Sequence, residues 1–406
     1  MSVNLDEYSI DRITKRGVAE IIVEEEFVSL IKTKNNLRLK MGFDPSSPDI
    51  HLGHAVGLRK LRQLQELGHR VILIVGDWTA MIGDPSGQTV TRPMLSRAEV
   101  NANAETYLRQ FFKIIDENKT ETVWQSEWFS KFTLEDVLGL TGRFTVAQFL
   151  AREDFSKRFK SQRPIAITEF LYPLLQAYDS IMVKADVEFG GTDQKFNLLV
   201  GRQLQTLLGH KPQQCFLVPI IPGTDGVKKM SKSLGNYIAI EENPKEMYGK
   251  IMSIPDHLIA DYFTLLTDIS TDDIKEITIS MNNNSVNPLH IKKRLAIEIV
   301  SQFHSPDSAK EAESYFTKVV QNKDFTEEIE DIYIPFSKFE GLSNSAILAD
   351  LSLAPSRAAA KRLINQNAVE INGQKITEDI PHITSINKAV VKIGKRKFVR
   401  IINKNE

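Results

Sequence analysis

A chain of 406 residues is too long for one ordinary hydrophobic core, so we expect two or three domains. Its hydrophobic share of 42% and charged share of 25% are typical of a soluble globular protein, and its single cysteine excludes an intrachain disulfide. The eight histidines stand outside any metal-ligand spacing, which argues against a structural zinc site, and the net charge of −1 by itself favours no class of partner.

The first 36 residues predict one or two amphipathic helices, with Phe27, Leu30 and Ile31 on the apolar side. This segment is charged from its start and lacks the apolar core of a signal peptide. The most apolar stretch of the chain, at residues 71–75, is far shorter than a bilayer span. We therefore expect a cytoplasmic protein without a membrane partner.

Residues 37–75 predict a strand, a helix and a second strand. Apolar residues alternate with others from Leu37 to Phe43, which is the pattern of a strand. After a turn that contains Pro and Ser, a helix is predicted from about residue 52 to 67, where Gly68 ends it. The apolar run at 71–75 is typical of a strand buried on both faces. These elements form one parallel βαβ unit with a right-handed crossover.

The βαβ pattern recurs near residues 186–209 and again at 215–221, so we predict an α/β fold with a doubly wound, parallel, Rossmann-like sheet. Between about 96 and 180 the chain is predicted to be mostly helical, which interrupts the sheet. The rest is predicted as a helical stretch at 242–325, a linker at 326–341 and a small αβ module at 342–406.

The charge is distributed unevenly. Residues 342–406 hold eleven Lys and Arg against five Asp and Glu, a net charge of +6, so the remainder carries −7 of the total of −1. A basic module on an acidic body is expected where one end of a protein meets nucleic acid. A lysine-rich solvated face explains this observation equally well.

The sequence HLGH at residues 51–54 falls at the predicted start of the first βαβ helix. Free backbone N–H groups and the helix dipole make this position an anion site. His51 and His54 lie about one turn apart, and Gly53 leaves room for a ligand to lie against the backbone. Taken alone, two such histidines are at least as well explained as a structural pair.

The second polar segment is the loop GTDGVKKMSKSLGN at residues 223–236, which follows a predicted strand. Its lysines, glycines and serines suit a mobile cationic loop that closes over a polyphosphate. A solvated basic loop is the alternative. The position at the carboxyl edge of the sheet favours a ligand site, because open α/β folds bind ligands there.

Here the sequence resembles a known family. HLGH resembles the HIGH signature, and KMSKS (229–233) matches the second signature, of class I aminoacyl-tRNA synthetases. The wider text resembles the tyrosine enzymes, in their second bacterial subgroup, and residues 356–376 resemble the RNA-binding fold of ribosomal protein S-four. The stretches that carry the resemblance to the tyrosine enzymes are KMGFDPSSPDIHLGH, IGDPSG (82–87), LYPLLQAYDS (171–180) and VEFGGTDQKFN (187–197).

The resemblance implies a domain plan and an assembly. Residues 1–240 would be the catalytic domain, with a helical dimerisation insertion at about 115–165, and residues 241–325 a helical anticodon-binding domain. Residues 342–406 would be an S-four-type RNA-binding domain beyond the linker. A homodimer is implied in the same way.

The resemblance also implies the reaction. L-Tyrosine and ATP would give tyrosyl-adenylate and pyrophosphate, and the tyrosyl group would pass to the 3′ end of tRNA(Tyr), with Mg²⁺ brought in by the phosphates and no protein metal site. The catalytic residues would be His51, His54, Lys229 and Lys232. The implied ATP-binding residues are Asp44, Ser46, His51, Gly53, His54, Gly191, Asp193, Lys229, Met230, Ser231, Lys232 and Ser233.

The tyrosine pocket follows from the same resemblance. Asp84, Tyr172 and Gln176 would receive the substrate ammonium, Gln194 would lie towards its carboxylate, and Asp179 would read the phenolic OH. A simple turn role is the alternative for Asp84. Lys40, Gly42, Asp44, Asp84, Tyr172, Gln176, Asp179 and Gln194 complete the implied tyrosine-binding set.

Two positions depart from the better-known subgroup. Lys40 stands where that subgroup has a tyrosine that contacts the substrate hydroxyl, and Glu188 stands where it has Gln. Strand alternation places Lys40 on the side of Gly42 and Asp44, so we expect it to face the site. Its ammonium would donate to the phenol oxygen, pair with an acidic neighbour, or swing away.

The C-terminal module offers a basic helical face for RNA, because Arg357, Lys361 and Arg362 are spaced i, i+4 and i+5. A second basic strip is formed by Lys392, Lys397 and Arg400 together with Lys395 and Arg396. The predicted tRNA-binding residues are Arg357, Lys361, Arg362, Lys395 and Arg396.

Three other functions fit parts of the sequence. The tryptophan enzyme shares the architecture, although Tyr172 and Asp179 favour tyrosine. An RNA-binding paralogue without catalysis would act through the tail alone, but HLGH and KMSKS are intact. A nucleotidyltransferase with a similar HxGH would explain the ATP site, but neither the helical stretch nor the basic tail.

Overall fold

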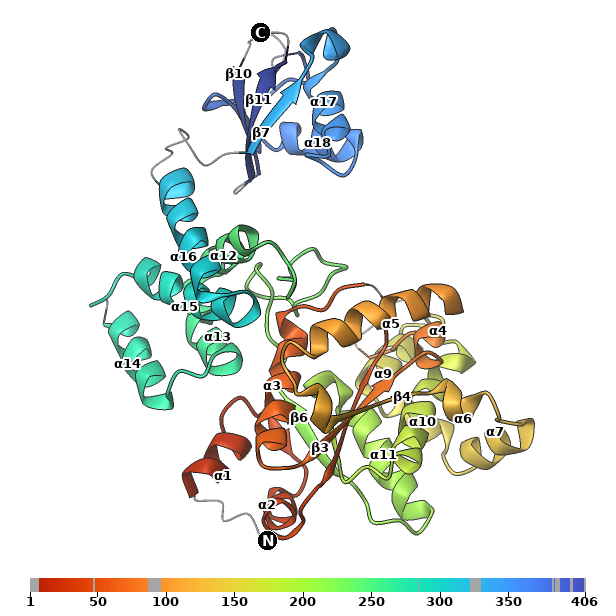
Figure 1. Ribbon diagram of the computed structural model, residues 1–406. Helices are drawn as coiled ribbons and strands as arrows, with labels where there is room; N and C mark the ends of the chain where they lie inside the picture. The colour runs from red at the N-terminus through yellow and green to blue at the C-terminus, as the bar shows by residue number, and fades with distance from the viewer. Residues whose placement is uncertain are drawn as a thin grey trace. The chain divides into compact units, whose positions relative to one another are not determined.

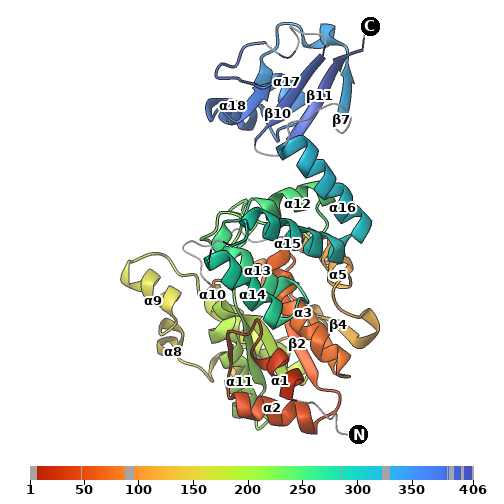
Figure 2. The ribbon, with the colours of Figure 1, turned by 90° about the vertical axis from the view of Figure 1, so that its left-hand side faces the viewer.

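The computed structural model of the chain describes residues 7–46, 48–86, 96–283, 285–321, 330–381, 383, 388–394 and 397–404. Its contacts divide the chain into two compact units, each described here by itself (Figure 1 and Figure 2). The first comprises Met1–Glu242 with Ser253–Leu295, and the second comprises Asn243–Met252 with Ala296–Glu406. Among the described helices none has the length and apolar character needed to cross a bilayer.

The first unit is built on a six-stranded sheet of order β1-β6-β5-β2-β3-β4. All neighbouring strands pair in parallel except β1, which is antiparallel to β6. The predicted doubly wound parallel sheet is confirmed, apart from the antiparallel edge strand β1. The strands are β1 (Glu20–Ile21), β2 (Arg38–Phe43), β3 (Arg70–Val75), β4 (Thr120–Trp124), β5 (Val187–Gly191) and β6 (Gln214–Val218).

Two crossover helices cover opposite faces of this sheet. Helix α3 (Leu52–Glu66) joins β2 to β3, and α11 (Lys195–Leu207) joins β5 to β6. The two connections run in opposite directions from the centre of the sheet, so right-handed crossovers place their helices on opposite faces. Figure 1 shows α3 on one side of the strands, and α11 with its neighbour α10 (Ile167–Met182) on the other.

Residues 96–180 are mostly helical, as predicted, but they also supply β4, which pairs with β3 as an edge strand. The prediction missed this strand because TETVW is partly exposed along its length and carries no continuous apolar run. The predicted insertion at 115–165 therefore begins too early, since residues 120–124 belong to the sheet.

The remaining helices of the first unit are α1 (Glu7–Thr14), α2 (Glu24–Thr33), α4 (Thr79–Ile82), α5 (Arg97–Phe111), α6 (Ser126–Phe129), α7 (Leu134–Thr141), α8 (Val146–Leu150), α9 (Glu153–Lys160), α13 (Ile259–Leu266) and α14 (Thr271–Asn282), with short 3₁₀ turns η1 (Glu117–Lys119), η2 (Thr192–Gln194) and η3 (Asp256–Leu258).

Contacts divide the predicted helical domain at 241–325 between the two units. Helix α13 packs on α3, and the Arg16 guanidinium donates to four backbone carbonyls between Phe263 and Ile269, which satisfies the C-terminal end of α13. These contacts join residues 253–295 to the first unit. The helices of the second unit are α12 (Pro244–Met252), α16 (Pro306–Tyr315), the π-helical η4 (Phe316–Gln321), α17 (Asn344–Asp350) and α18 (Arg357–Asn365), and α15 (Pro288–Phe303) crosses the division.

The second unit carries a sheet of order β7-β11-β10-β8-β9 with helices α17 and α18 beside it. Its first strand lies in the predicted linker, which is a correction. Residues 330–334 pair in parallel with β11, and Ile334, Phe336 and Phe339 are buried in the core of this module. The strand was missed because it begins with two consecutive acidic residues, Glu330 and Asp331, and only Ile334 of its five residues is buried. The elements are β7 (Glu330–Ile334), η5 (Phe336–Phe339), β8 (Val369–Ile371), β9 (Gln374–Lys375), β10 (Lys388–Ile393) and β11 (Lys397–Asn403).

Candidate active site

The candidate site lies where the carboxyl ends of β2 and β5 meet. These two strands are neighbours at the point where the order of crossovers reverses, which is where open α/β sheets bind ligands. Asp44 follows β2 directly, and Gly191 ends β5. The predicted cationic loop begins shortly after β6. The sheet therefore gathers residues that are far apart in the sequence at one edge.

The HLGH segment forms the start of α3, with His51 as its N-terminal cap. His51 Nδ1 accepts from the Gly53 N–H at 3.1 Å, and His54 Nδ1 accepts from the His51 N–H at 3.2 Å. The two rings lie 4.1 Å apart between centroids. A Cβ on Gly53 would stand 2.9 Å from the His51 ring, so glycine is required there by the fold of the cap itself.

These contacts fix the proton positions of both rings. Because each Nδ1 accepts a hydrogen bond, each neutral ring carries its proton on Nε2 and keeps a donor there. Burial lowers the pKa of His54 to about 4, with the nearby Lys232 and Lys229 acting in the same direction. Burial likewise lowers the pKa of His51 far below its ordinary value. Both imidazoles are therefore neutral donors at pH 7.

The low pKa of His54 predicts a pH-dependent stability. The unfolded chain binds a proton at this residue near pH 6.5, whereas the folded chain binds it only near pH 4. Stability is thus fully present above pH 6.5 and is lost as the pH falls towards 4, by up to about 1.4 kcal/mol per pH unit. The loss of unfolding free energy from pH 7 to pH 5 should be about 1–2 kcal/mol smaller in His54→Gln than in the unsubstituted protein.

Urea unfolding followed by tryptophan fluorescence measures this, because the three tryptophans, Trp78, Trp124 and Trp128, all lie in the first unit. Groups that do not interact with His54 titrate equally in both proteins and cancel in the comparison, and burial alone is the largest cause that keeps the neighbouring His51 neutral. An identical pH dependence in the two proteins would show that His54 is not held neutral by the fold.

The loop at residues 223–236 is held down by Asn236. Its side chain accepts from the Ser231 N–H at 2.8 Å and donates to Asp225 at 2.9 Å. A Cβ on Gly223 would stand 2.4 Å from Asn236, so only glycine allows this approach. Met230 is 1% exposed and anchors the centre of the loop.

Two lysines of this loop turn towards the edge of the sheet. Lys229 forms an ion pair with Asp193, and Lys232 donates to the backbone carbonyl of Asp49, just before HLGH. Burial lowers the pKa of Lys232 to about 8. The Leu52 N–H donates to the Ile238 carbonyl at 3.0 Å, which ties the end of the loop to the start of α3. HLGH and KMSKS are thus neighbours. Ser231 and Ser233 bond to each other at 2.8 Å between their hydroxyls.

A second cluster surrounds Asp44 and Asp84. The Tyr172 hydroxyl donates to Asp44 Oδ2 at 2.8 Å, and Thr79 Oγ1 donates to Asp44 Oδ1 at 2.7 Å. Gln194 Nε2 donates to Asp84 Oδ2 at 2.7 Å. Asp84 also accepts from the Ser86 N–H, which is the turn contact considered from sequence. The structure brings these predicted residues together, beside Gly42 and the exposed Ser46 at the end of β2.

Asp179 is 2% exposed and accepts from two residues that the sequence did not reveal. Gln125 Nε2 donates to it at 2.8 Å and Trp128 Nε1 at 3.2 Å. Burial raises the pKa of Asp179 to about 7, while Lys40 and these two donors oppose the rise. Gln125 directly follows β4, and Trp128 lies in the next helix, α6. Because β4 was not predicted, neither residue was identified as a neighbour of Asp179. A carboxylate has about four acceptor sites, so Asp179 retains capacity for a further donor.

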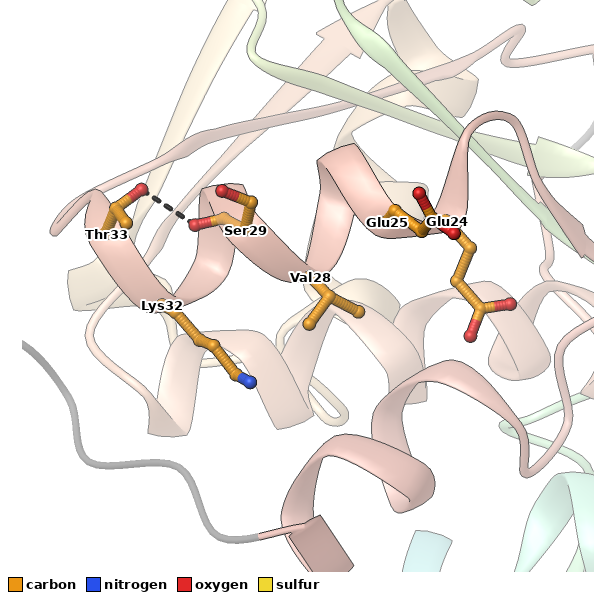
Figure 3. A pocket seen from close by; sticks show the side chains of 6 residues that line it. All are labelled: Glu24, Glu25, Val28, Ser29, Lys32 and Thr33. Atoms are coloured by element: carbon orange, nitrogen blue, oxygen red, sulfur yellow. Dashed lines mark hydrogen bonds between the residues drawn. The ribbon is translucent and has the colours of Figure 1, made fainter.

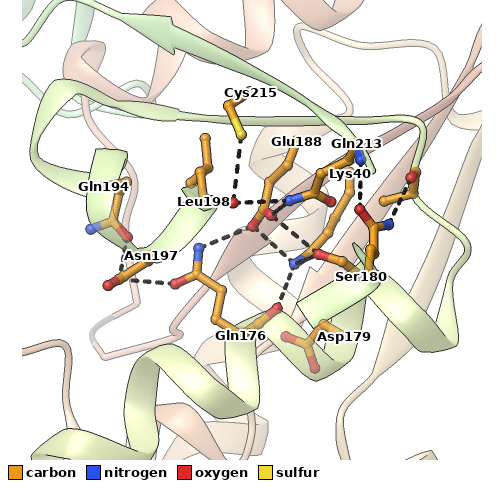
Figure 4. A network of polar contacts seen from close by, with 12 residues as sticks. Lys40, Gln176, Asp179, Ser180, Glu188, Gln194, Asn197, Leu198, Gln213 and Cys215 are labelled. Carbon is orange, nitrogen blue, oxygen red and sulfur yellow. Dashed lines mark hydrogen bonds and ion pairs between the residues drawn. The ribbon is translucent and has the colours of Figure 1, made fainter. Parts of the chain in front are cut away.

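Lys40 is completely buried and does not swing away. It pairs with Glu188 at 2.9 Å, which is the acidic-neighbour alternative (Figure 4). Gln176 donates to the same carboxylate at 3.0 Å. The Lys40 ammonium is enclosed on this side of the sheet, because α10 covers it with the Gln176 carbonyl and the Ser180 hydroxyl, each 2.7 Å away.

The basic face of the C-terminal module is present on α18, where Arg357, Lys361 and Arg362 are all exposed. The second basic strip carries less unpaired positive charge than its sequence indicates. Lys392 pairs with Glu370 and Arg400 pairs with Asp331, both at 2.9 Å, so their charges are partly neutralised. Lys395 and Arg396 lie outside the described residues.

The surface hollow in Figure 3 is separate from these residues. It has a volume of about 630 Å³ and follows one side of α2, so a single helix lines it. None of the predicted site residues is among those that line it, which are Glu24, Glu25, Val28, Ser29, Lys32 and Thr33. Within the described part of the chain, no cluster of three or more His, Cys, Asp or Glu side chains could hold a metal ion.

Comparison with known proteins covers nearly the whole chain. The family described as tRNA synthetases class I (W and Y) matches residues 32–321, and the S4 domain family matches residues 346–379. A tyrosine–tRNA ligase of Dehalococcoides mccartyi is 57% identical over 98% of this chain and 100% of its own length. That of Thermotoga maritima is 51% identical over 96% of each chain.

Solved structures show the same fold. The tyrosyl-tRNA synthetase of Archaeoglobus fulgidus, solved with L-tyrosine, superposes with a TM-score of 0.62 at 26% identity, covering 75% of this chain and 98% of that one. A C-terminally truncated mitochondrial tyrosyl-tRNA synthetase of Aspergillus nidulans superposes with a TM-score of 0.65 at 20% identity, covering 77% and 94%.

Proposed function

The chain belongs to the tyrosine–tRNA ligases, which are class I aminoacyl-tRNA synthetases, and from this premise we propose how its residues carry out the reaction. L-Tyrosine and ATP react to give tyrosyl-adenylate and pyrophosphate, and tyrosine then passes to the 3′ end of tRNA(Tyr). The observation that carries the residue assignment is the meeting of HLGH and KMSKS beside the cluster around Asp44 and Asp84. No covalent enzyme intermediate is required, so catalysis rests on positioning and charge stabilisation.

ATP binds at the N-terminus of α3 in this proposal. The Nε2–H groups of His51 and His54 donate to its phosphates, and their neutrality avoids a fixed charge that would hold the product pyrophosphate. Lys229 and Lys232 supply positive charge as negative charge develops on the leaving pyrophosphate. When ATP binds, the Asp193 carboxylate releases Lys229 and accepts a hydrogen bond from a ribose hydroxyl instead. The other proposed ATP contacts are Asp44, Ser46, Gly53, Gly191, Met230, Ser231 and Ser233.

Tyrosine binds between β2 and α10 in this proposal. Asp84, Tyr172 and Gln176 receive its ammonium, Gln194 lies towards its carboxylate, and Asp179 accepts from its phenolic OH. Three oxygen acceptors match the three donors of an ammonium. A buried carboxylate distinguishes tyrosine from phenylalanine, which has a hydrogen atom in place of the hydroxyl. Magnesium would enter with the phosphates of ATP.

ATP–pyrophosphate exchange tests the activation step. The purified protein should exchange pyrophosphate into ATP with tyrosine, and neither tryptophan nor phenylalanine should support it at a comparable kcat/KM. Exchange with tryptophan alone would assign the chain to the tryptophan enzymes. Exchange with none of the three would favour an RNA-binding protein that has lost catalysis.

The C-terminal module is proposed to bind tRNA through α18. Replacing Arg357, Lys361 and Arg362 together with alanine should weaken tRNA binding. It should also reduce the log–log salt slope by about 0.7–0.9 for each phosphate group that these side chains neutralise. Filter binding at several salt concentrations measures both effects, and pyrophosphate exchange should be unchanged. Unaltered tRNA affinity would exclude this face as a tRNA-binding surface. Substitution is preferable to deleting 342–406, which would leave β7 without β11.

A homodimer is proposed through the helical insertion. Four large apolar side chains of this stretch, and a fifth directly after it at the start of α10, are more than 60% exposed, which is unfavourable for a surface that stays in water. These are Leu134, Leu138, Val146, Phe159 and Ile167.

The dimer proposal predicts that Leu138→Asp combined with Ile167→Asp halves the mass measured by sedimentation. Ile279→Asp is the matched control, because Ile279 is also exposed, at 58%, but lies in α14. This control should sediment like the unsubstituted protein. A monomeric unsubstituted protein would contradict the proposal.

A further inference from the structure

The buried pair of Lys40 and Glu188 lies at the centre of a closed polar network (Figure 4). The two residues are Cα partners on the neighbouring strands β2 and β5, so their side chains leave the same face of the sheet side by side. Lys40 is 0% and Glu188 1% exposed in their side chains. Removing two charges from water is costly, and such pairs are weak evidence of stability.

Every polar site of the pair is used. The Lys40 ammonium has three donors, which meet Glu188 Oε1, the Gln176 carbonyl and the Ser180 hydroxyl. Glu188 accepts two donors on each oxygen: Lys40 and Gln176 on Oε1, and Ser180 and Gln213 on Oε2. A charged carboxylate only accepts, so any neighbouring amide must turn its NH₂ group towards Glu188.

This requirement sets the orientation of Gln176. Because its Nε2 donates to Glu188 at 3.0 Å, its Oε1 points the other way and accepts from Asn197 Nδ2 at 3.1 Å. Asn197 also donates to Gln194 Oε1 at 2.9 Å, and Gln194 Nε2 donates to Asp84 at 2.7 Å. Asn197 Oδ1 accepts from Arg152 at 3.2 Å, so Asn197 turns its NH₂ group to both glutamines, and Gln176 is oriented by Glu188 at one end and by Asn197 at the other. The series runs from the buried ion pair to the carboxylate proposed for the substrate ammonium.

We propose that Lys40 and Glu188 are positioning residues for the ammonium site, which hold Gln176 with its carbonyl oxygen turned towards the amino group of the substrate. The proposal rests on the proposed function of that site. The ion pair never contacts the substrate. Its effect is to leave an acceptor, rather than an NH₂ group, at the place where a cation binds.

The substitution Glu188→Gln should reverse this orientation. The new side chain has one acceptor oxygen for the four donors that Glu188 satisfies, so its own NH₂ group must face one of them. Gln176 relieves the conflict by turning its oxygen towards that NH₂ group. Its own NH₂ group then faces the substrate ammonium, and the hydrogen bond from Asn197 to Gln176 Oε1 is lost as well. Tyrosine should then lose affinity because of its ammonium, whereas a ligand without that group should not.

The test compares tyrosine with 3-(4-hydroxyphenyl)propionate, which lacks only the ammonium. The preference for tyrosine is the dissociation constant of the propionate divided by that of tyrosine, measured by equilibrium dialysis and by inhibition of exchange. This preference isolates the contribution of the ammonium. In Glu188→Gln it should fall by about tenfold or more, because a hydrogen bond to a charged group is no longer made. The KM for ATP should change little.

Two further variants separate positioning from folding. Lys40→Met with Glu188→Gln removes both charges and leaves none unpaired. It should also lower the preference while keeping its melting temperature close to that of the unsubstituted protein. Glu169→Gln is the matched control, because Glu169 forms another buried ion pair on α10, with Arg158, outside this network. Its preference should be unchanged.

A preference in Glu188→Gln and in the double variant within twofold of the unsubstituted protein would overturn the inference. An equal fall in Glu169→Gln would also overturn it, because general loosening of α10 would then suffice. Failure of the unsubstituted protein to bind tyrosine would instead refute the proposed function, so the two failures are distinguishable.

Discussion

Asp179→Ala should reduce the preference for tyrosine over phenylalanine by about 100-fold, measured as the ratio of kcat/KM values in pyrophosphate exchange. Tyrosine–tRNA ligases are the standard example of a site that rejects a substrate lacking one hydroxyl, because a buried polar group is then left unpaired. Asp179 is buried, its two oxygens are oriented by Gln125 and Trp128, and it retains acceptor capacity for a phenolic OH. Without this acceptor, the phenolic OH of tyrosine gains no hydrogen bond, so the pocket binds tyrosine and phenylalanine with similar free energies.

Asp186→Ala is the matched control for this substitution. Asp186 also accepts backbone and lysine donors, but it stands before β5, at the opposite edge of the sheet from the site. It should lower stability without changing the preference. If Asp179→Ala retained the full preference, the phenolic OH would be read by another residue.

Lys229→Ala and Lys232→Ala should each lower the kcat for pyrophosphate exchange by about 100-fold or more, which is the usual cost of removing one group that stabilises transition-state charge. Both side chains already turn towards the edge of the sheet, where they contact Asp193 and the Asp49 carbonyl. The KM for tyrosine should change much less, because the charge they meet develops on the phosphates.

Lys228→Ala provides the control within the same loop. Lys228 is exposed, and its backbone rather than its side chain holds the loop, through Asp225 and Asn236. The kcat of the Lys228→Ala variant should remain within about twofold of that of the unsubstituted protein, as expected for the loss of an exposed charge. Equal decreases at Lys228 and Lys229 would indicate general electrostatic attraction of ATP instead of a clamp on pyrophosphate.

The elements with strong local signals could be predicted from the sequence. The alternation before Asp44, the apolar run at residues 71–75 and Gly68, whose φ is 91°, define β2, α3 and β3 closely. Strands β4 and β7 were missed because β4 is partly exposed along its length and β7 begins with two acidic residues and buries only Ile334. Both are recognised by their pairing partners, which only the tertiary structure supplies.

The same limit applies to the site. HLGH, KMSKS and the residues of α10 were identified by resemblance, and the fold brings them to one edge of the sheet. The role of Lys40 depended on which residue faces it across β2 and β5, and strand register cannot be read from either strand alone. Gln125 and Trp128 were not identified because β4, the strand that precedes them, was not predicted.

Aminoacylation of unfractionated bacterial tRNA is the most direct test of the central claim, because it requires the ATP site, the tyrosine pocket and the tRNA surface together. With each radioactive amino acid supplied in turn, the protein should charge tRNA with tyrosine in an ATP-dependent reaction, up to the number of tyrosine acceptors present. Charging with tryptophan, or no charging despite active pyrophosphate exchange, would contradict the account.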